Sequence, residues 1–248
     1  MITLTPLRTL PEVRCGDDLA ALICDAAERE GLRWSEGSVI VAAQKIVSKS
    51  EGLIVDLRTV TPPAEACELA EELGRDPRLV AVILSESRRV IRKARGVLIV
   101  ETHHGWQCAN AGVDQSNVPG EDCVTLLPRD ADASAARLLA GLQARQAPAA
   151  GVVISDTFGR PWRNGLTNVA IGLAGFAPLH DYRGCSDRHG HVLKGTIVAV
   201  ADELAAAAEL LMGKAEGIPV VIISGFRVDA GAGTAKDLIR PEAEDLFR

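Results

Sequence analysis

The chain is poor in aromatic residues, which make up 3% of its 248 positions. An aliphatic core is therefore expected, and a hydrophobic content of 47% is typical of a globular protein that buries a substantial core. The amino terminus lacks the charged and apolar regions of a signal peptide, and no apolar run is long enough to span a membrane. These absences predict a cytoplasmic protein with no membrane partner.

The distribution of cysteine and of charge excludes further classes of function. The six cysteines are far apart and form no CxxC pair, so zinc and disulfide-exchange motifs are not supported and free thiols are expected. The net charge of −6 argues against a nucleic-acid partner, because nonspecific binding to nucleic acid requires a positive surface. A small anionic ligand, held by a local basic cluster, remains compatible with this composition.

Apolar periodicity predicts a chain in which helices and short buried strands follow one another. Apolar stripes and capping residues predict helices at 19–29, 65–73, 130–145 and 201–212, and another from 77 onward. Apolar runs predict strands at 38–43, 97–100, 152–154 and 220–223. This spacing alone favours a parallel α/β sheet.

The stretch GVVISDTFGRPWRNG, residues 151–165, carries the clearest chemical pattern. A short apolar strand is followed by oxygen-bearing side chains, among them Asp156 and Thr157, and then by a turn-rich segment with Arg160 and Arg163. Hard oxygen ligands bind Mg²⁺ or Mn²⁺, and arginine binds phosphate oxygens in a fork. The pattern suggests a metal and phosphate site, although a capped turn with solvated arginines would also explain it.

Two other segments carry polar groups at positions typical of ligand binding. Lys45 and Lys49 follow a predicted strand, and the carboxyl end of a strand is a usual place for ligand-binding groups. The glycines of a P-loop are missing there. Around Asp114 and Asn117, small residues would let the backbone approach a ligand closely. Asp114 becomes a candidate metal ligand only if the fold brings it beside Asp156, which the spacing leaves open.

Three motifs occur in one order: AGVDQSNV at 111–118, ISDTFGRPWRNG at 154–165 and ADELAAAAELLMGKAEGIP at 201–219. Together they resemble the coenzyme F420-0:L-glutamate ligase family in its stand-alone form, over nearly the whole chain. The resemblance implies an α+β fold with mixed and antiparallel sheets and flanking helices. It also implies one ligase domain over residues 1–248, with two intertwined subdomains, and an interlocked homodimer.

The activity implied by the resemblance is GTP-dependent amide ligation. L-Glutamate would be joined to the carboxyl of coenzyme F420-0 through an acyl phosphate, and further γ-linked glutamates could follow. Mg²⁺ or Mn²⁺ is implied, and K⁺ is an additional candidate ion. Two alternatives remain open: an amide ligase for another carboxylated cofactor, or a non-catalytic deazaflavin- or nucleotide-binding protein.

The resemblance assigns roles to individual residues. It implies metal binding by Asp114, Asp156 and Thr157. Nucleotide contacts are implied for Leu10, Pro11, Glu12, Val13, Gln44, Lys49, Asn117, Met212, Gly213, Lys214 and Gly217. The two aspartates would act in catalysis with Lys49 and with Arg160 or Arg163, whose charges would offset the developing phosphoryl charge. Many relatives have Gln in place of Lys214, where it is linked to a second metal, so the ligands of a second metal are open here.

Overall fold

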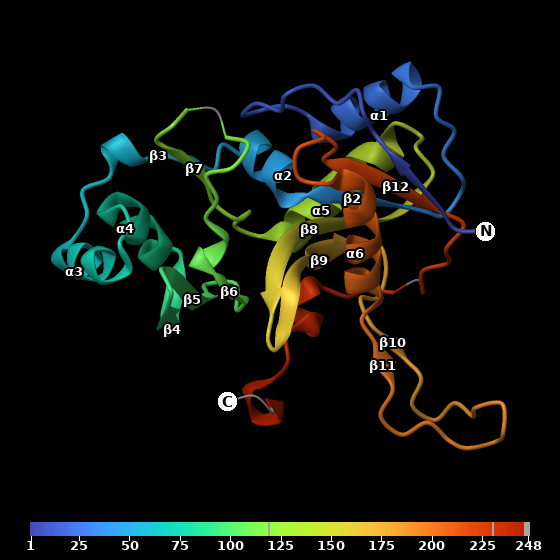
Figure 1. The fold of residues 1–248 in the computed structure, drawn as a ribbon. Coiled ribbons are helices and arrows are strands. Elements are labelled where there is room, and N and C mark those ends of the chain that lie inside the picture. Colours follow the sequence, from blue (N-terminus) through green and yellow to red (C-terminus); the bar gives the residue numbers. More distant parts are fainter. Residues whose placement is uncertain (119, 230, 246–248) are drawn as a thin grey trace.

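A five-stranded sheet forms the centre of the protein, which is described here from a computed structural model over residues 1–118, 120–229 and 231–245. Its strand order is β1-β12-β2-β8-β9, and only β2 and β8 run parallel (Figure 1). The strands are β1 (Thr3–Pro6), β12 (Val220–Ser224), β2 (Ser38–Ala43), β8 (Ala149–Arg160) and β9 (Arg163–Ala174). The mixed sheet with flanking helices is confirmed. The parallel sheet favoured by spacing is wrong, because β12 and β9 return antiparallel to their neighbours.

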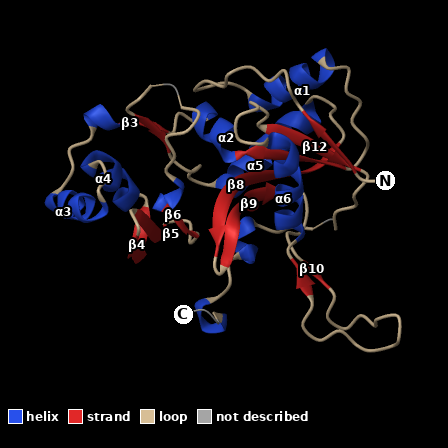
Figure 2. Cartoon of the chain, viewed as in Figure 1, coloured by secondary structure: helices blue, strands red, loops and turns tan. Residues whose placement is uncertain are grey.

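Helices cover both faces of this sheet (Figure 2). Since alternate residues of a strand face opposite sides, Ile40 and Ala42 of β2 pack with α1 (Leu19–Arg29) and α5 (Ala131–Ala144), while Val39 and Val41 pack with α6 (Val200–Met212). All four of these side chains are fully buried. Two aliphatic cores therefore pack against the opposite faces of the sheet and hold it in place.

The predicted helices are present with small shifts at their ends. Asp18 and Asp130 lie just before α1 and α5 and accept hydrogen bonds from backbone N–H groups of the first turn. Asp76 does the same for α4 (Pro77–Ser85), which starts with the expected first-turn proline. Helix α3 (Ala64–Leu73) ends at Gly74, whose φ of 64° is the left-handed conformation common at helix ends. Capping side chains thus mark the starts of α1, α4 and α5, and a left-handed glycine marks the end of α3.

Strands β8 and β9 extend beyond the sheet as a two-stranded hairpin. The predicted strand ends at Ile154, but β8 continues to Arg160 because β9 pairs with it antiparallel to the tip. A register shift between Ile154 and Ser155 marks the point where the hairpin leaves the apolar core. The expected turn-rich segment is therefore mostly strand, and Trp162, with φ of 57°, lies in its tight turn.

A smaller lobe, on the left in Figure 1, has its own apolar core. It contains α3, α4 and a three-stranded sheet of β4 (Ser87–Ala94), β5 (Val97–Thr102) and β6 (Gln107–Ala109). A basic run at 88–95 forms most of the exposed edge strand β4. Strands β3 (Ile54–Asp56) and β7 (Cys123–Thr125) pair beside this lobe, and single 3₁₀ turns η1 (Leu57–Thr59) and η2 (Asn110–Gly112) follow β3 and β6.

The remaining elements lie at the periphery. Strands β10 (His180–Asp181) and β11 (Ile197–Val198) pair at the base of an arm that projects from the body, at lower right in Figure 1. Short 3₁₀ turns η3 (Ala235–Leu238) and η4 (Glu242–Glu244) lie near the carboxyl end. Within the described residues, every helix is too short or too polar to cross a lipid bilayer.

Candidate functional site

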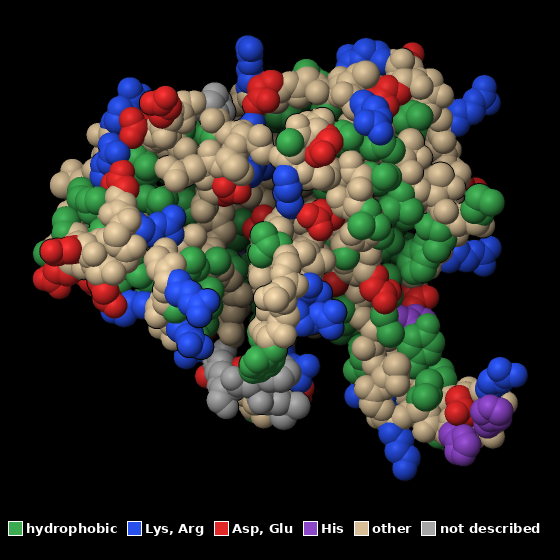
Figure 3. All heavy atoms as spheres, in the orientation of Figure 1, with side chains coloured by type: hydrophobic (Ala, Val, Ile, Leu, Met, Phe, Trp, Pro, Cys, Tyr) green, Lys and Arg blue, Asp and Glu red, His purple; other side chains and the backbone are tan. Residues whose placement is uncertain are grey.

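A cavity of about 770 Å³ lies where the parallel pairing of β2 with β8 ends, at Ala43 and Ser155. Parallel strands place their carboxyl ends at one edge of a sheet, so the residues that follow Ala43 and Ser155 meet there. The other walls come from three separate segments. They are the amino-terminal segment around residues 10–13, the loop after η2, and the end of α6 with the segment that follows it. Figure 3 shows the surface hollowed between the small lobe and the β8–β9 hairpin.

Almost all the site residues predicted from the sequence line this cavity. The lining includes Leu10, Pro11, Glu12, Val13, Gln44, Lys49, Asp114, Asn117, Asp156, Thr157, Met212, Gly213, Lys214 and Gly217. Arg160 and Arg163 are outside it, at the exposed tip of the β8–β9 hairpin, where the Arg160 guanidinium donates to the carbonyl of Asn164. The continued pairing of β8 with β9 carries both arginines away from Asp156. The structure thus does not bring them to the candidate metal ligands.

Asp156 and Thr157 are held at the cavity by the hairpin geometry. The Thr157 hydroxyl donates to Oδ1 of Asn168, its cross-strand partner on β9, at 2.7 Å. The same hydroxyl oxygen accepts a hydrogen bond from Lys214 Nζ at 2.6 Å. Lys214 also forms an ion pair with Glu209 at 3.0 Å, which ties the end of α6 to the hairpin. Asn168 also lines the cavity, and sequence reasoning missed it because its position opposite Thr157 depends on a hairpin that the sequence did not predict.

Asp114 projects from the loop after η2, which is fixed by a backbone bridge to Thr125 of β7. Its carboxylate accepts hydrogen bonds from the backbone N–H of Ser116 at 2.7 Å and from Lys45 Nζ at 2.9 Å. Burial acts to raise the pKa of Asp114, but these two donors outweigh it and hold the pKa below its usual value. Asp114 is therefore ionised across the neutral range.

Asp156 has the opposite electrostatic character. Burial raises its pKa to about 6, against the lowering effect of the Thr157 backbone N–H. The negative charge of Asp114 adds to the rise, while the ammonium groups of Lys45 and Lys214 oppose it. Asp114 thus lies close enough to Asp156 to act on its titration, and the proximity that the sequence left open is present.

Helix α2 (Gln44–Ser50) carries three polar residues to the cavity immediately after β2. Gln44 is buried and its side-chain oxygen accepts a hydrogen bond from the Ser48 hydroxyl. Lys49 is only 6% exposed, and its ammonium contacts Oε1 of Glu12 at 2.5 Å. Lys45 is the third, and sequence reasoning noted its place after the strand without assigning it a role. The helix thus supplies one buried cation, Lys49, and one partly buried cation, Lys45, which face different acidic groups.

The end of α6 depends on the backbone freedom of a glycine. Gly213 has φ of 57° and ψ of −160°, a combination that only glycine adopts readily. A Cβ at this position would also lie 1.9 Å from the Glu216 carboxylate. Glycine here lets the chain turn sharply from the helix into the cavity wall, where Met212 and Lys214 are neighbours of Thr157 and Asn168.

Cys108 is buried next to Asp156, but its surroundings make it unreactive. Burial and the charge of Asp156 raise the pKa of the thiol to about 12, so it is protonated at neutral pH. All six cysteines are free thiols, as the sequence predicts.

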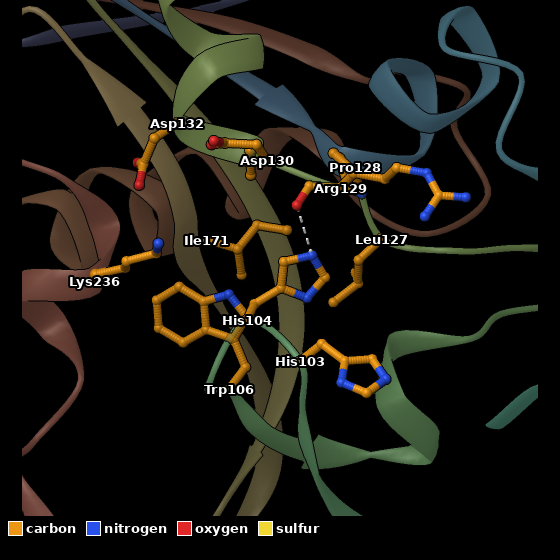
Figure 4. Close-up of a pocket in the computed structure, with 11 residues that line it drawn as sticks. His103, His104, Trp106, Leu127, Pro128, Arg129, Asp130, Asp132, Ile171 and Lys236 are labelled. Carbon is orange, nitrogen blue, oxygen red and sulfur yellow. Dashed lines mark hydrogen bonds between the residues drawn. The ribbon is translucent and has the colours of Figure 1, made fainter. Parts of the chain in front are cut away.

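A second cavity of about 130 Å³ lies between the β5–β6 turn and the start of α5 (Figure 4). His104 Nε2 contacts the carbonyl of Arg129 at 3.1 Å, and its Nδ1 is buried without a partner among the described residues. The Asp132 carboxylate accepts hydrogen bonds from the backbone N–H groups of Leu173 and Ala235, both at 2.9 Å. The Asp132 carboxylate in this second cavity thus holds α5, β9 and η3 together.

The donor set around the larger cavity fits a hard divalent cation. It offers two carboxylates and a hydroxyl, the oxygen ligands that Mg²⁺ and Mn²⁺ prefer. In the described part of the chain, no three His, Cys, Asp or Glu side chains converge as a complete metal cage. Such a partial set suits an ion that takes its remaining ligands from water and phosphate, as Mg²⁺ does at nucleotide sites.

Comparison with known proteins identifies the family. The family model for F420-0:gamma-glutamyl ligase matches residues 8–225. The chain belongs to the F420-0:gamma-glutamyl ligase family. The match spans most of the sequence and includes the cavity residues on the hairpin, the loop after η2 and the end of α6.

Relatives of this F420-0:gamma-glutamyl ligase family member cover most or all of the chain. A protein of Methanothermobacter thermautotrophicus named coenzyme F420:L-glutamate ligase is 47% identical over 100% of this chain and 99% of its own length. Proteins of the same name from Methanopyrus kandleri and Methanocaldococcus jannaschii are each 44% identical, over 100% and 86% of this chain and 98% and 85% of their own lengths. The expectation that the chain is an enzyme of this ligase family is confirmed.

Proposed function

We propose that this chain is a GTP-dependent amide ligase that joins L-glutamate to the carboxyl of coenzyme F420-0 and then adds further γ-linked glutamates. One observation carries the proposal: this chain, which belongs to the ligase family, has two carboxylates and a hydroxyl, with lysines beside them, around a single cavity. The names of the relatives specify the coenzyme and glutamate as the molecules joined. The nucleotide follows from chemistry, because an amine does not displace oxide from an unactivated carboxylate.

The reaction is inferred to run in two steps. A carboxylate oxygen of the acceptor attacks the γ-phosphorus of GTP, and the bond between that phosphorus and the β-phosphate oxygen breaks. GDP departs, and the acceptor now carries an acyl phosphate. The glutamate amine then attacks the acyl carbon, the carbon–oxygen bond to phosphate breaks, and phosphate departs as the amine gives up a proton. Both steps need negative charge to be neutralised and reactants to be held in line.

The residues divide this work by charge and position. Asp114, Asp156 and Thr157 would hold Mg²⁺ or Mn²⁺, with K⁺ as an additional ion; the divalent ion would neutralise the triphosphate. Lys49 is a buried lysine, and its burial would strengthen the electrostatic attraction between its ammonium group and a phosphoryl group. Gln44 and Asn117 offer amide groups for the nucleotide, and the segments at 10–13 and 212–217 would enclose it.

We also infer an interlocked homodimer built from a chain with two intertwined subdomains. The arm at β10 and β11 supports this inference, because it carries the exposed apolar residues Tyr182, Val192 and Ile197 away from the body of the protein. The separate apolar core of the small lobe supports the second subdomain. Light scattering on the purified chain should give twice the monomer mass, and a monomer mass at micromolar concentration would contradict the dimer.

The function is tested by mass spectrometry of the acceptor. The purified protein is incubated with coenzyme F420-0, L-glutamate, Mn²⁺ and GTP, and a parallel tube contains ATP. We expect a GTP-dependent gain of glutamyl units, whose number gives the length of the tail. Equal gain with ATP would refute the GTP dependence. No gain with either nucleotide would favour another acceptor, and nucleotide binding without turnover on any acceptor would favour a binding protein.

A further inference from the structure

Lys45 occupies an unusual position in the cavity, because its ammonium group is surrounded by acceptors of one loop. Its Nζ is 2.9 Å from Asp114 Oδ2, 2.8 Å from the carbonyl of Ser116 and 2.6 Å from the Ser116 hydroxyl. These three acceptors match the three donors of an ammonium group. The Lys45 side chain is 19% exposed, so the contact is partly shielded from water. Lys45 thus holds the Asp114 loop to helix α2.

Both carboxylate oxygens of Asp114 already have hydrogen-bond donors. Oδ2 faces both Lys45 and the Ser116 hydroxyl at 3.0 Å, and Oδ1 accepts the Ser116 backbone N–H. The Lys45 ammonium therefore already occupies one of the two oxygens through which Asp114 would bind a divalent cation. Because two cations repel strongly at such separations in a shielded site, both cannot share Oδ2 at contact distance.

A flexible lysine can resolve this conflict by changing partners. Its four-carbon chain and point charge allow it to bind phosphate oxygens as readily as carboxylate. Lys45 lines the same cavity as Lys49 and Asp156, where the phosphates of the nucleotide would lie. Release from Asp114 would thus move one positive charge from the loop to the reacting phosphates.

We propose that Lys45 is an exchangeable cation: it holds Asp114 while the site lacks a divalent ion, and it shifts to nucleotide phosphate when the ion binds Asp114. The inference rests on the proposed function, because it requires a divalent ion at Asp114. It adds a residue that contacts the substrate and couples metal binding to nucleotide binding. Nucleotide should bind poorly to the wild-type chain without the ion, since Lys45 is then engaged elsewhere.

The test measures Mn²⁺ binding to the full chain in the absence of nucleotide, from the electron paramagnetic resonance signal of free Mn²⁺. Lys45→Met removes the competing charge, so we expect its dissociation constant for Mn²⁺ to fall about fivefold, the equivalent of one partly exposed ion pair. Its dissociation constant for GTP, measured at saturating Mn²⁺, should rise about tenfold through loss of a phosphate contact. Lys45→Gln provides a second neutral variant if the first does not fold.

Lys93→Met is the matched control, because Lys93 forms a lysine–carboxylate pair of similar length with Glu72 on the surface of the small lobe. It should leave both dissociation constants unchanged. Mn²⁺ binding by Lys45→Met that is equal to or weaker than that of wild type would overturn the inference, since a purely structural Lys45 predicts that result. If wild type binds Mn²⁺ and makes glutamylated product, the proposed function holds even when the Lys45 inference fails. Absence of Mn²⁺ binding in wild type and both neutral variants would overturn the metal site as well.

Discussion

Replacement of Asp156 by Asn is expected to abolish turnover and, in metal-free protein, to increase stability. Folding raises the pKa of Asp156 from 3.8 to about 6, so the folded chain binds a proton more tightly than the unfolded chain. Stability therefore falls as pH rises from about 4 to about 6, and the full cost is present above pH 6. A difference of roughly two pKa units corresponds to about 3 kcal/mol at pH 7.5.

The asparagine variant removes this cost because its amide carries no charge at any pH. Since about 1 kcal/mol shifts the melting temperature of a protein this large by about 2–4 °C, the variant should melt about 6–12 °C above wild type at pH 7.5 with chelator present. At pH 4 most of the difference should vanish, because the wild-type carboxyl is then protonated in the folded chain. Scanning calorimetry at both pH values measures the effect.

Mn²⁺ should reverse the order of stability. Mn²⁺ at 1,000 times its dissociation constant stabilises the folded state by about 4.1 kcal/mol, which exceeds the cost of about 3 kcal/mol, and only wild type retains Asp156 to bind it. Asp25→Asn, on the exposed face of α1, is the control and should change neither stability nor turnover. The reasoning is refuted if Asp156→Asn gains no stability at pH 7.5, or gains the same amount at pH 4.

Two further predictions test other parts of the site and its support. Lys49→Met should raise the KM for GTP at least about tenfold and leave Glu12 without its cation, with steady-state kinetics as the measurement. A near-normal KM would remove Lys49 from the nucleotide site. Gly172→Ala should cost about 3 kcal/mol in urea unfolding, because its Cβ would lie 2.5 Å from the backbone of Ala131. Gly195→Ala, where nothing lies within 4 Å, should be neutral by comparison, and equal losses would contradict the packing argument.

Much of the fold could be predicted because its signals are local. The cap at Asp18 and the apolar stripe that follows it give α1 its observed bounds, and α6 differs from expectation by a single residue. Strand β2 also has the predicted limits, so its end at the cavity was expected. Each of these features depends on residues within a few positions of one another, which a sequence displays directly.

Features that depend on pairing between distant segments could not be predicted in the same way. Strand β8 continues past Ser155 only because β9 supplies backbone partners, and this pairing carries Arg160 and Arg163 away from the site. The same pairing places Asn168 against Thr157. Gly, Pro and Asn-Gly signals between 159 and 165 favoured a long turn, but a two-residue connection at the tip satisfied them.

The candidate site follows from the one parallel pair in the central sheet. The parallel pairing of β2 with β8 ends at Ala43 and Ser155, and the polar residues that line the cavity, such as Gln44 and Asp156, begin immediately beyond it. Antiparallel neighbours bring one start and one end to an edge, so they would not have gathered both sets. Asp114 lies on the loop that comes from the small lobe, and its ion pair with Lys45 joins that loop to this edge of the sheet. Ion binding at Asp114 would therefore act on the contact between the small lobe and the central sheet, as well as on the phosphates that the cavity would hold.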